Sequence, residues 1–358
     1  MSDRVTIAPV GPNPYSYPSP AMAYGPMPTS PAQPATSYQG SPDQLYLSAY
    51  PPLASGVSPT VAPAAAPSIP LLPVLSGLLQ QLQALVNRWL SAPGTPPAPG
   101  DQPPSRPATN FVISSFNVLG NSHTAPGGNK PGWDPGTVRI RSAAKLLEQH
   151  DVDVVGFQEM QRPQLKAFLE VAEDRYAVYP NLSKGTKDTD NAIAWRKDKW
   201  ELVKPGSLEI PYFDGHKRKM PLLLLRNRQT GQEAYFLNVH NPADTRDHLN
   251  QERWRDQATG LEVELVNRLR RETGLPVFVT GDMNEQAEAF QHFTQGTDLA
   301  AANEGPGGKL PKQVGIDWIF GSPDVTFRGY TRDRSTIEHK TSDHPMVVSR
   351  ARIDGASS

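Results

Sequence analysis

Six short segments of this chain each place a carboxylate, a carboxamide or an imidazole beside an apolar run. The clearest is "VFVTGDMNEQ", in which residues 277–280 predict a buried strand that stops at Gly281. Any one of these polar residues alone is explained as a turn residue, a cap or a satisfied core histidine. The six segments together favour one shared site, because caps need not all be oxygen or imidazole ligands. In chain order the residues are Asn117, Glu159, His240, Asp282 with Asn284, Asp317, and Asp343 with His344.

The chemistry available to such a site is metal binding and proton transfer. Carboxylate and carboxamide oxygens are the hard ligands that Mg²⁺ or Mn²⁺ prefers. His240 and His344 can take or give a proton near neutral pH. The chain contains no cysteine, which excludes thiol nucleophiles and cysteine-ligated zinc, and the two histidines lack the i, i+4 spacing of helical zinc sites. We therefore expect Mg²⁺ or Mn²⁺ as the cofactor.

The elements that must position these residues follow from the hydrophobic periodicity beyond Asn110. Helices are predicted over 137–150, 162–173 and 248–272. Between about 190 and 240 strands follow one another directly, separated by turn signals such as "RQTGQ", which is typical of a meander. We therefore predict an α/β domain with mixed sheets over residues 110–355. Its strands are predicted at "FVISSFNV", "VDVVGFQE", "NAIAWR", "PLLLLRN", "AYFLNVH", "PVFVTGD", "IDWIFG" and "PMVVSRA".

The ordered motifs "FNVLG", "GFQEM", "NVHNP", "TGDMNE", "IDWIF" and "SDHP" resemble those of the endonuclease/exonuclease/phosphatase superfamily. Deoxyribonuclease I, abasic-site endonucleases of the exonuclease III type, neutral sphingomyelinases, inositol polyphosphate 5-phosphatases and deadenylases belong to it. The resemblance covers about Asn110 to Arg352. It implies a four-layer α/β sandwich, in which two mixed sheets lie face to face with helices outside, and a divalent-metal phosphoesterase that uses an activated water.

The resemblance also implies which residues hold the metal. Asn117 and Glu159 would bind the catalytic ion, and Asp343 would complete its site. Asp282 would be a metal ligand or a proton-transfer group beside the scissile phosphate. Whether one or two ions act is left open.

For the remaining site residues, the resemblance implies roles in proton transfer and phosphate binding. His344 would be the general base on the attacking water, oriented by Asp317. Asn284 would orient the phosphate, and His240 would donate a hydrogen bond or a proton to it.

A basic segment, "DGHKRKMP", offers a phosphate clamp. Arg218 or Lys219 lies just before Pro221 and a strand, where members similar to deoxyribonuclease carry a basic residue. A solvated charge run on an edge hairpin is an equal alternative.

The substrate class is narrowed by departures from the subfamily patterns. Abasic-site endonucleases carry a lysine soon after the motif glutamate, whereas Met160, Gln161 and Arg162 follow Glu159 here. The extra motifs of inositol phosphatases and sphingomyelinases are not found. We predict an endonuclease similar to deoxyribonuclease I, with DNA as its phosphodiester partner, although a net charge of −1 offers no basic face for a duplex.

Two alternatives to a nuclease remain. One is a phosphoesterase for lipids or inositol phosphates, similar to sphingomyelinases or inositol phosphatases. The other, from a different class, is a tethered binding module that has lost its chemistry. The second is disfavoured because all eight motif positions carry the expected residue types.

Residues 1–109 differ from the rest of the chain in composition. Of the 38 prolines, 24 lie in residues 1–110, which predicts a largely disordered tail. An amphipathic helix is expected near 74–90, where it could dock on the domain or self-associate, and it is too short and polar to span a bilayer. The first 20 residues show no secretory signal, so we expect a cytoplasmic protein or export by an unrecognised route.

Overall fold

The computed structural model describes residues 107–183 and 188–355. The predicted helix near 74–90 and nearly all of the proline-rich tail lie outside these ranges. Within the described part of the chain, no helix is both long enough and apolar enough to cross a membrane.

The first sheet contains six strands in the order β11-β12-β1-β2-β4-β3. Only β1 and β2 are parallel, and every other neighbouring pair in this sheet is antiparallel. β2 is buried along its whole length, which explains why its sequence is a continuous apolar run without alternation. The strands are β1 (Thr109–Asn117), β2 (Val154–Gln158), β3 (Tyr176–Tyr179), β4 (Ala192–Arg196), β11 (Val325–Asp333) and β12 (Met346–Ile353).

The second sheet also contains six strands, in the order β5-β6-β7-β8-β10-β9. Here β7 and β8 are the parallel pair. β5 and β6 form a long antiparallel hairpin that supplies the outer edge. The strands are β5 (Trp200–Pro211), β6 (Lys217–Asn227), β7 (Glu233–His240), β8 (Val277–Asp282), β9 (Ala300–Ala301) and β10 (Asp317–Gly321).

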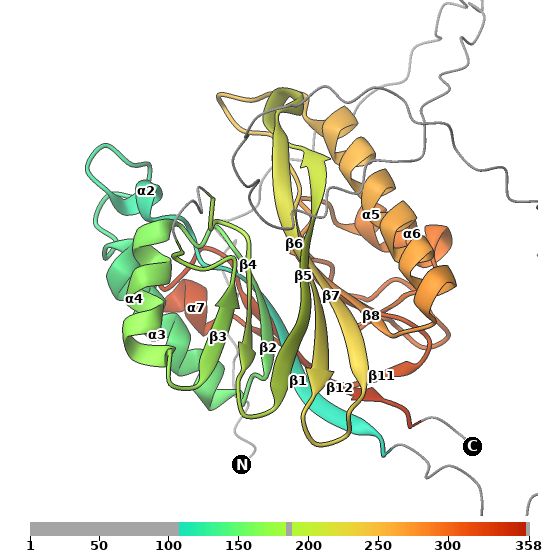
Figure 1. Cartoon of the computed structure of the whole chain (residues 1–358). Helices are drawn as coiled ribbons and strands as arrows, with labels where there is room; N and C mark the ends of the chain where they lie inside the picture. The colour runs from blue at the N-terminus through green and yellow to red at the C-terminus, as the bar shows by residue number, and fades with distance from the viewer. Residues whose placement is uncertain (1–106, 184–187, 356–358) are drawn as a thin grey trace, which may run out of the picture. The chain divides into compact units, whose positions relative to one another are not determined.

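Helices cover the outer face of each sheet (Figure 1). α3 and α4 pack against the first sheet through residues such as Leu147 and Phe168. α5 and α6 pack against the second through Val266 and Phe293. The helices are α2 (Asn121–Thr124), α3 (Gly136–Gln149), α4 (Arg162–Ala172), α5 (Glu252–Thr273), α6 (Ala287–Gly296) and α7 (Ser335–Glu338), with a 3₁₀ turn at Phe213–Gly215.

A third apolar cluster fills the space between the two sheets. Phe111 of β1 meets Trp200, Phe236 and Phe278 of the second sheet at ring-centroid distances of 5.1, 6.0 and 5.3 Å. The order of layers is therefore helix, sheet, sheet, helix, and the predicted four-layer sandwich is confirmed.

Near one end of the sandwich the core between the sheets becomes polar. Gln158 Nε2 donates to Oδ1 of Asn238, 2.7 Å away, and Asn238 Nδ2 donates to the carbonyl of Phe157 at 2.8 Å. A Cβ atom at Gly156 would lie 2.1 Å from Thr280 Oγ1, so only glycine allows the sheets to approach here. This contact brings the carboxyl ends of β1 and β2 close to those of β7 and β8.

Several elements were not predicted from periodicity, among them β5, β11 and α6. β5 contains Pro205 and Gly206, which indicate a turn, but it is an edge strand, where proline is tolerated. The helix predicted from 248 begins at Glu252, because residues 241–251 form a loop.

Candidate active site

Strand register alone brings three of the predicted residues into one row. His240 of β7 pairs with Asp282 of β8, and Asp282 pairs with Asp317 of β10. All three side chains are almost completely buried. The row therefore crosses the second sheet at the end where β7 and β8 finish.

The first sheet contributes the opposite wall. Asn117 is the last residue of β1, and Glu159 directly follows β2, which runs parallel to β1. The segment that precedes β12 is tied to this end because Ser342 Oγ donates to the carbonyl of Asn117 at 2.6 Å. The same hydroxyl accepts from the backbone N–H of His344 at 3.1 Å. These bonds bring His344 to the end of β1.

Asn117 links the carboxylates of the two sheets. Its Nδ2 donates to Glu159 Oε1 at 2.9 Å and to Asp282 Oδ2 at 3.0 Å. Its Oδ1 accepts from the backbone N–H of Leu119 at 3.0 Å. Asn117 thus orients the two carboxylates as a hydrogen-bond donor, and its direct binding of metal stays a prediction.

Glu159 is held as a carboxylate. Burial would raise its pKa, but hydrogen bonds from His123, Gly120 and Asn117 oppose burial, and the pKa is held far below its usual range. The backbone of Glu159 is left-handed, with φ of 59°. Such a conformation costs a non-glycine residue about 1–3 kcal/mol, and strained residues of this kind cluster at active sites.

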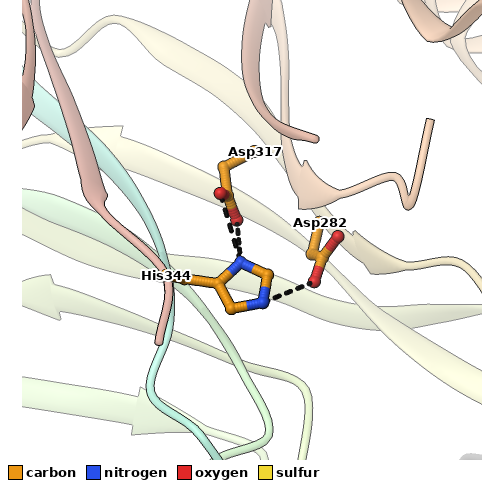
Figure 2. Close-up of side chains that lie close together, drawn as sticks. All are labelled: Asp282, Asp317 and His344. Carbon is orange, nitrogen blue, oxygen red and sulfur yellow. Dashed lines mark hydrogen bonds and ion pairs between the residues drawn. The ribbon is translucent and has the colours of Figure 1, made fainter. Parts of the chain in front are cut away.

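Figure 2 shows His344 between two carboxylates. Its Nδ1 lies 3.0 and 3.2 Å from the two oxygens of Asp317, and its Nε2 lies 3.7 Å from Asp282 Oδ2. Burial lowers the pKa of His344, but the charges of Asp317 and Asp282 outweigh burial and hold it well above its ordinary value. An imidazole oriented through one nitrogen, with the other directed into the site, has the arrangement of a general base.

His240 lies on the other side of Asp282. Its Nε2 is 3.7 Å from Asp282 Oδ2, and its Nδ1 is 3.5 Å from the hydroxyl of Tyr212. Burial lowers the pKa of His240, which favours the neutral imidazole. A neutral imidazole can donate one hydrogen bond to a substrate oxygen.

Asn284 also adopts a left-handed backbone, with φ of 51°. Its backbone N–H donates to Asp282 Oδ1 at 3.0 Å, and its Nδ2 donates to the carbonyl of Asn241 at 2.8 Å. The side chain is therefore fixed beside Asp282.

The two candidate phosphate-binding residues, Arg218 and Lys219, differ in the side of β6 from which they project. Arg218 stacks over the Tyr212 ring at 4.7 Å and binds Asp188 at 3.0 Å and Asp190 at 2.5 Å. Lys219, the next residue of β6, points to the opposite face of the strand and is exposed. The structure thus brings Arg218, and not Lys219, next to Tyr212 and His240.

Two basic residues that were not predicted from the sequence reach the site from the segment after β1: His123 from α2 and Lys130 from the loop that follows it. His123 Nε2 lies 3.3 Å from Glu159 Oε2, and Lys130 Nζ lies 2.8 Å from Asp343 Oδ2. Asp343 is thereby paired with Lys130, and its predicted role as a metal ligand stays a prediction. The only sequence signal for His123 and Lys130 is their position soon after the Asn117 motif.

The donor set fits a hard divalent cation. Glu159 and Asp282 present carboxylate oxygens from opposite sheets, joined through Asn117. Burial raises the pKa of Asp282, so a cation beside it would stabilise the charged form. Potential ligand atoms of Asp282, Asp317 and His344 also lie within 4.8 Å of one another, although Nδ1 of His344 is already used by Asp317.

The fold and this site define a known class of α/β sandwich hydrolases. The chain belongs to the Endonuclease/Exonuclease/phosphatase family, whose sequence profile matches residues 114–344. Members of this family hydrolyse phosphoester bonds and depend on divalent metal ions. The chain has no significant match among curated protein sequences.

Solved structures share the fold at low sequence identity. An endonuclease/exonuclease/phosphatase family protein from Bacteroides thetaiotaomicron is 22% identical, with a TM-score of 0.54, and the match covers 69% of this chain and 99% of that one. A mannosyl-6-phosphatase from the same bacterium is 22% identical, with a TM-score of 0.52 and coverage of 67% and 99%. The catalytic domain of human Nocturnin is 16% identical, with a TM-score of 0.53 and coverage of 69% and 95%.

Proposed function

We propose that this protein hydrolyses a phosphodiester by attack of a water molecule that His344 activates. The observation that carries the proposal is the Asp317–His344 pair, in which the second imidazole nitrogen, Nε2, lies 3.7 Å from Asp282 Oδ2. Asp317 fixes the ring through Nδ1, which leaves Nε2 to take a proton from water when the imidazole is in its neutral form. Family membership supports hydrolysis as the reaction class.

In this proposal Glu159 and Asp282 hold Mg²⁺ or Mn²⁺, with Asn117 keeping their oxygens in place and Asp343 completing the site. The ion supplies positive charge that stabilises the charge developing on the nonbridging phosphate oxygens. Asn284 and His240 donate hydrogen bonds to the same oxygens. Because His240 is buried and neutral, its hydrogen bond is made without a second buried charge.

We propose DNA as the substrate, cleaved in the manner of deoxyribonuclease I. Arg218 supports this assignment, since a guanidinium beside the site suits a phosphate of the backbone. Tyr212 holds the Arg218 side chain in position against its ring. A nuclease of this kind should lose apparent affinity as salt is added, because phosphate contacts release counterions.

A second candidate is a phosphatase for a small phosphorylated molecule, which includes a lipid headgroup or an inositol phosphate. It is favoured by the pairing of the cations around the site: Arg218 with Asp188 and Asp190, and Lys130 with Asp343. Paired cations and a net charge of −1 leave little positive surface for a long polyanion.

One substrate panel separates these candidates. The full chain would be assayed with Mg²⁺ and with Mn²⁺ on plasmid DNA, single-stranded DNA, RNA, abasic duplex, sphingomyelin, inositol polyphosphates and sugar phosphates. Glu159→Gln serves as the control for contaminating enzymes. Nicking of plasmid DNA by the wild type alone supports the nuclease. Release of phosphate from a small substrate with DNA intact moves the protein to the second candidate, and activity that is unchanged in Glu159→Gln contradicts both.

A further inference from the structure

Glu262 is a carboxylic acid buried in α5 and is not one of the candidate active-site residues. It is 0% exposed, and neither of its oxygens has a hydrogen-bond partner among the described residues. It shares the inner face of α5 with Thr259, three residues before it, and with Arg255, seven residues before it. A side chain of this kind needs a specific reason to be inside a protein.

The groups around Glu262 do not compensate a negative charge. Arg255 lies on the same face but donates to the carbonyl of Pro242 at 2.9 Å and to Asp244 at 2.9 Å. The other charged neighbour is Glu285, whose Oε1 is 3.6 Å from Arg255 and whose Oε2 is 3.8 Å from His292. A buried carboxylate without its own cation is costly, so the proton-bound form is favoured. Consistent with this, burial raises the pKa of Glu262 to about 8.

Asn241 is the side chain that complements a neutral Glu262. It is 0% exposed, and its Nδ2 donates to Thr259 Oγ1 at 3.2 Å. Its Oδ1 is buried and has no hydrogen-bond partner among the described residues. The Asn241 side chain also lies near the Glu262 carboxyl group, and its effect on the pKa of Glu262 is to lower it, against the larger effect of burial. A protonated carboxyl offers one O–H donor, and Asn241, held against the same face of α5 by Thr259, offers one unused acceptor.

Asn241 also connects this buried pair to the active site. Its backbone N–H donates to the carbonyl of Asp282 at 3.0 Å. Its own carbonyl accepts from Nδ2 of Asn284 at 2.8 Å. A shift of Asn241 would therefore move the side chain that faces the phosphate.

We propose that Glu262 is a positioning residue whose uncharged carboxyl group donates to Oδ1 of Asn241 and so fixes Asn284 in the site. This inference rests on the proposed phosphate-binding role of Asn284. Glu262 touches no reacting atom and acts through Asn241 alone.

The test uses the full chain with three substitutions on α5. Glu262→Gln keeps a hydrogen-bond donor of the same shape, Glu262→Leu keeps the volume without a donor, and Glu264→Gln changes an exposed neighbour as the control. On the substrate found in the panel, Glu262→Gln and Glu264→Gln should keep kcat within about threefold. Glu262→Leu should lose about tenfold or more in kcat, as expected for one buried hydrogen bond, while circular dichroism shows a folded protein.

A second measurement does not depend on turnover. In protein labelled with ¹⁵N at asparagine, the side-chain amide signals of Asn241 and Asn284 are assigned with Asn241→Ala and Asn284→Ala. In the wild type the Asn241 signal should titrate with a midpoint near pH 8 and should stay constant in Glu262→Gln. The Asn284 signal should move in Glu262→Leu.

The two measurements separate the possible failures. Unchanged amide signals in Glu262→Leu, or an Asn241 titration that persists in Glu262→Gln, overturn the inference even if the enzyme is active. Signals that behave as expected, in a protein that hydrolyses nothing in the panel, support the positioning role and contradict the proposed function instead.

Discussion

The side-chain nitrogen of Asn117 lies 3.0 Å from Oδ2 of Asp282 and joins the end of β1 in one sheet to the end of β8 in the other. The same nitrogen reaches Glu159 at 2.9 Å. The separation of the two carboxylates is thus set by one donor that spans both sheets. Any change in the packing between the two sheets should therefore change the distance between the carboxylates of the candidate metal site.

Hydrolysis should depend on a divalent cation. Full-length protein treated with excess chelator is expected to lose activity, which Mg²⁺ or Mn²⁺ restores, because Glu159 and Asp282 form a hard oxygen donor set. Glu159→Gln should show no recovery, whereas Glu173→Gln, an exposed change at the end of α4, should behave as wild type. Full activity in chelator would exclude the metal assignment.

His344→Ala should reduce kcat by about 10²–10⁴, the usual contribution of a positioned general base. Asp317→Asn should lose part of the same factor, because His344 Nδ1 then lacks its carboxylate partner. His339→Ala, at an exposed histidine five residues away, is the control and should not change the rate. Thermal melts establish that each variant is folded, and a wild-type rate in folded His344→Ala would rule out its role as base.

Arg218 and Lys219 make a matched pair of adjacent cations. Arg218→Ala should lower kcat/KM by about 10- to 150-fold, equivalent to a charged hydrogen bond of about 1.5–3 kcal/mol. Lys219→Ala should have little effect, because Lys219 points away from Tyr212 and His240. Equal losses of kcat/KM in the two variants would show that the hairpin acts through its overall positive charge and that Arg218 is not a specific phosphate-binding residue.

Because Glu262 is buried, the free energy of unfolding should decrease as the pH rises. Its pKa is about 8 in the folded protein against 4.5 as the ordinary value, so the folded state holds this proton more tightly than the unfolded state. The contribution of this proton to the free energy of unfolding is complete below pH 4.5 and is lost as the pH rises to 8. The loss is on the order of 5 kcal/mol, since each pKa unit corresponds to about 1.4 kcal/mol.

Urea denaturation of wild type and Glu262→Gln across pH 5–9 measures this contribution, since the glutamine does not titrate. The difference in free energy of unfolding between the two proteins should change steadily up to pH 8 and level off above it. A difference that is constant with pH would mean that Glu262 is ionised in the folded protein.

Gly156→Ala should destabilise the fold by about 1–3 kcal/mol or more, because its Cβ would lie 2.1 Å from Thr280 Oγ1 and 2.2 Å from Asn238 Oδ1. Gly260→Ala is the opposite case. Gly260 lies within α5, and nothing is found within 4 Å of its added Cβ, so alanine should stabilise the helix by up to about 1 kcal/mol. Chemical denaturation compares both with wild type, and equal stability of the two variants would contradict close packing at Gly156.

The sequence predicted the fold, and it named the strand-end residues that the structure brings together, because apolar runs and the polar residues that end them can be recognised locally. Asp282 and His240 end strands with clear apolar runs, and strand ends in neighbouring strands meet by register. The choice between Arg218 and Lys219 could not be made, because it depends on which face of β6 points to Tyr212. His123 lies on the short helix α2 and Lys130 on the irregular loop after it, and the contacts that bring them to Glu159 and Asp343 are tertiary.

The left-handed backbone at Glu159 and Asn284 implies that stability and catalysis make opposite demands at these two positions. Glycine would adopt φ of 59° or 51° without strain, so the backbone at both positions is kept at a cost to stability. Selection of this protein for thermal stability alone should therefore favour substitutions at these two positions, and the resulting variants should be more stable but inactive. Directed evolution of this protein for higher thermal stability therefore needs a screen for catalytic activity from its first round.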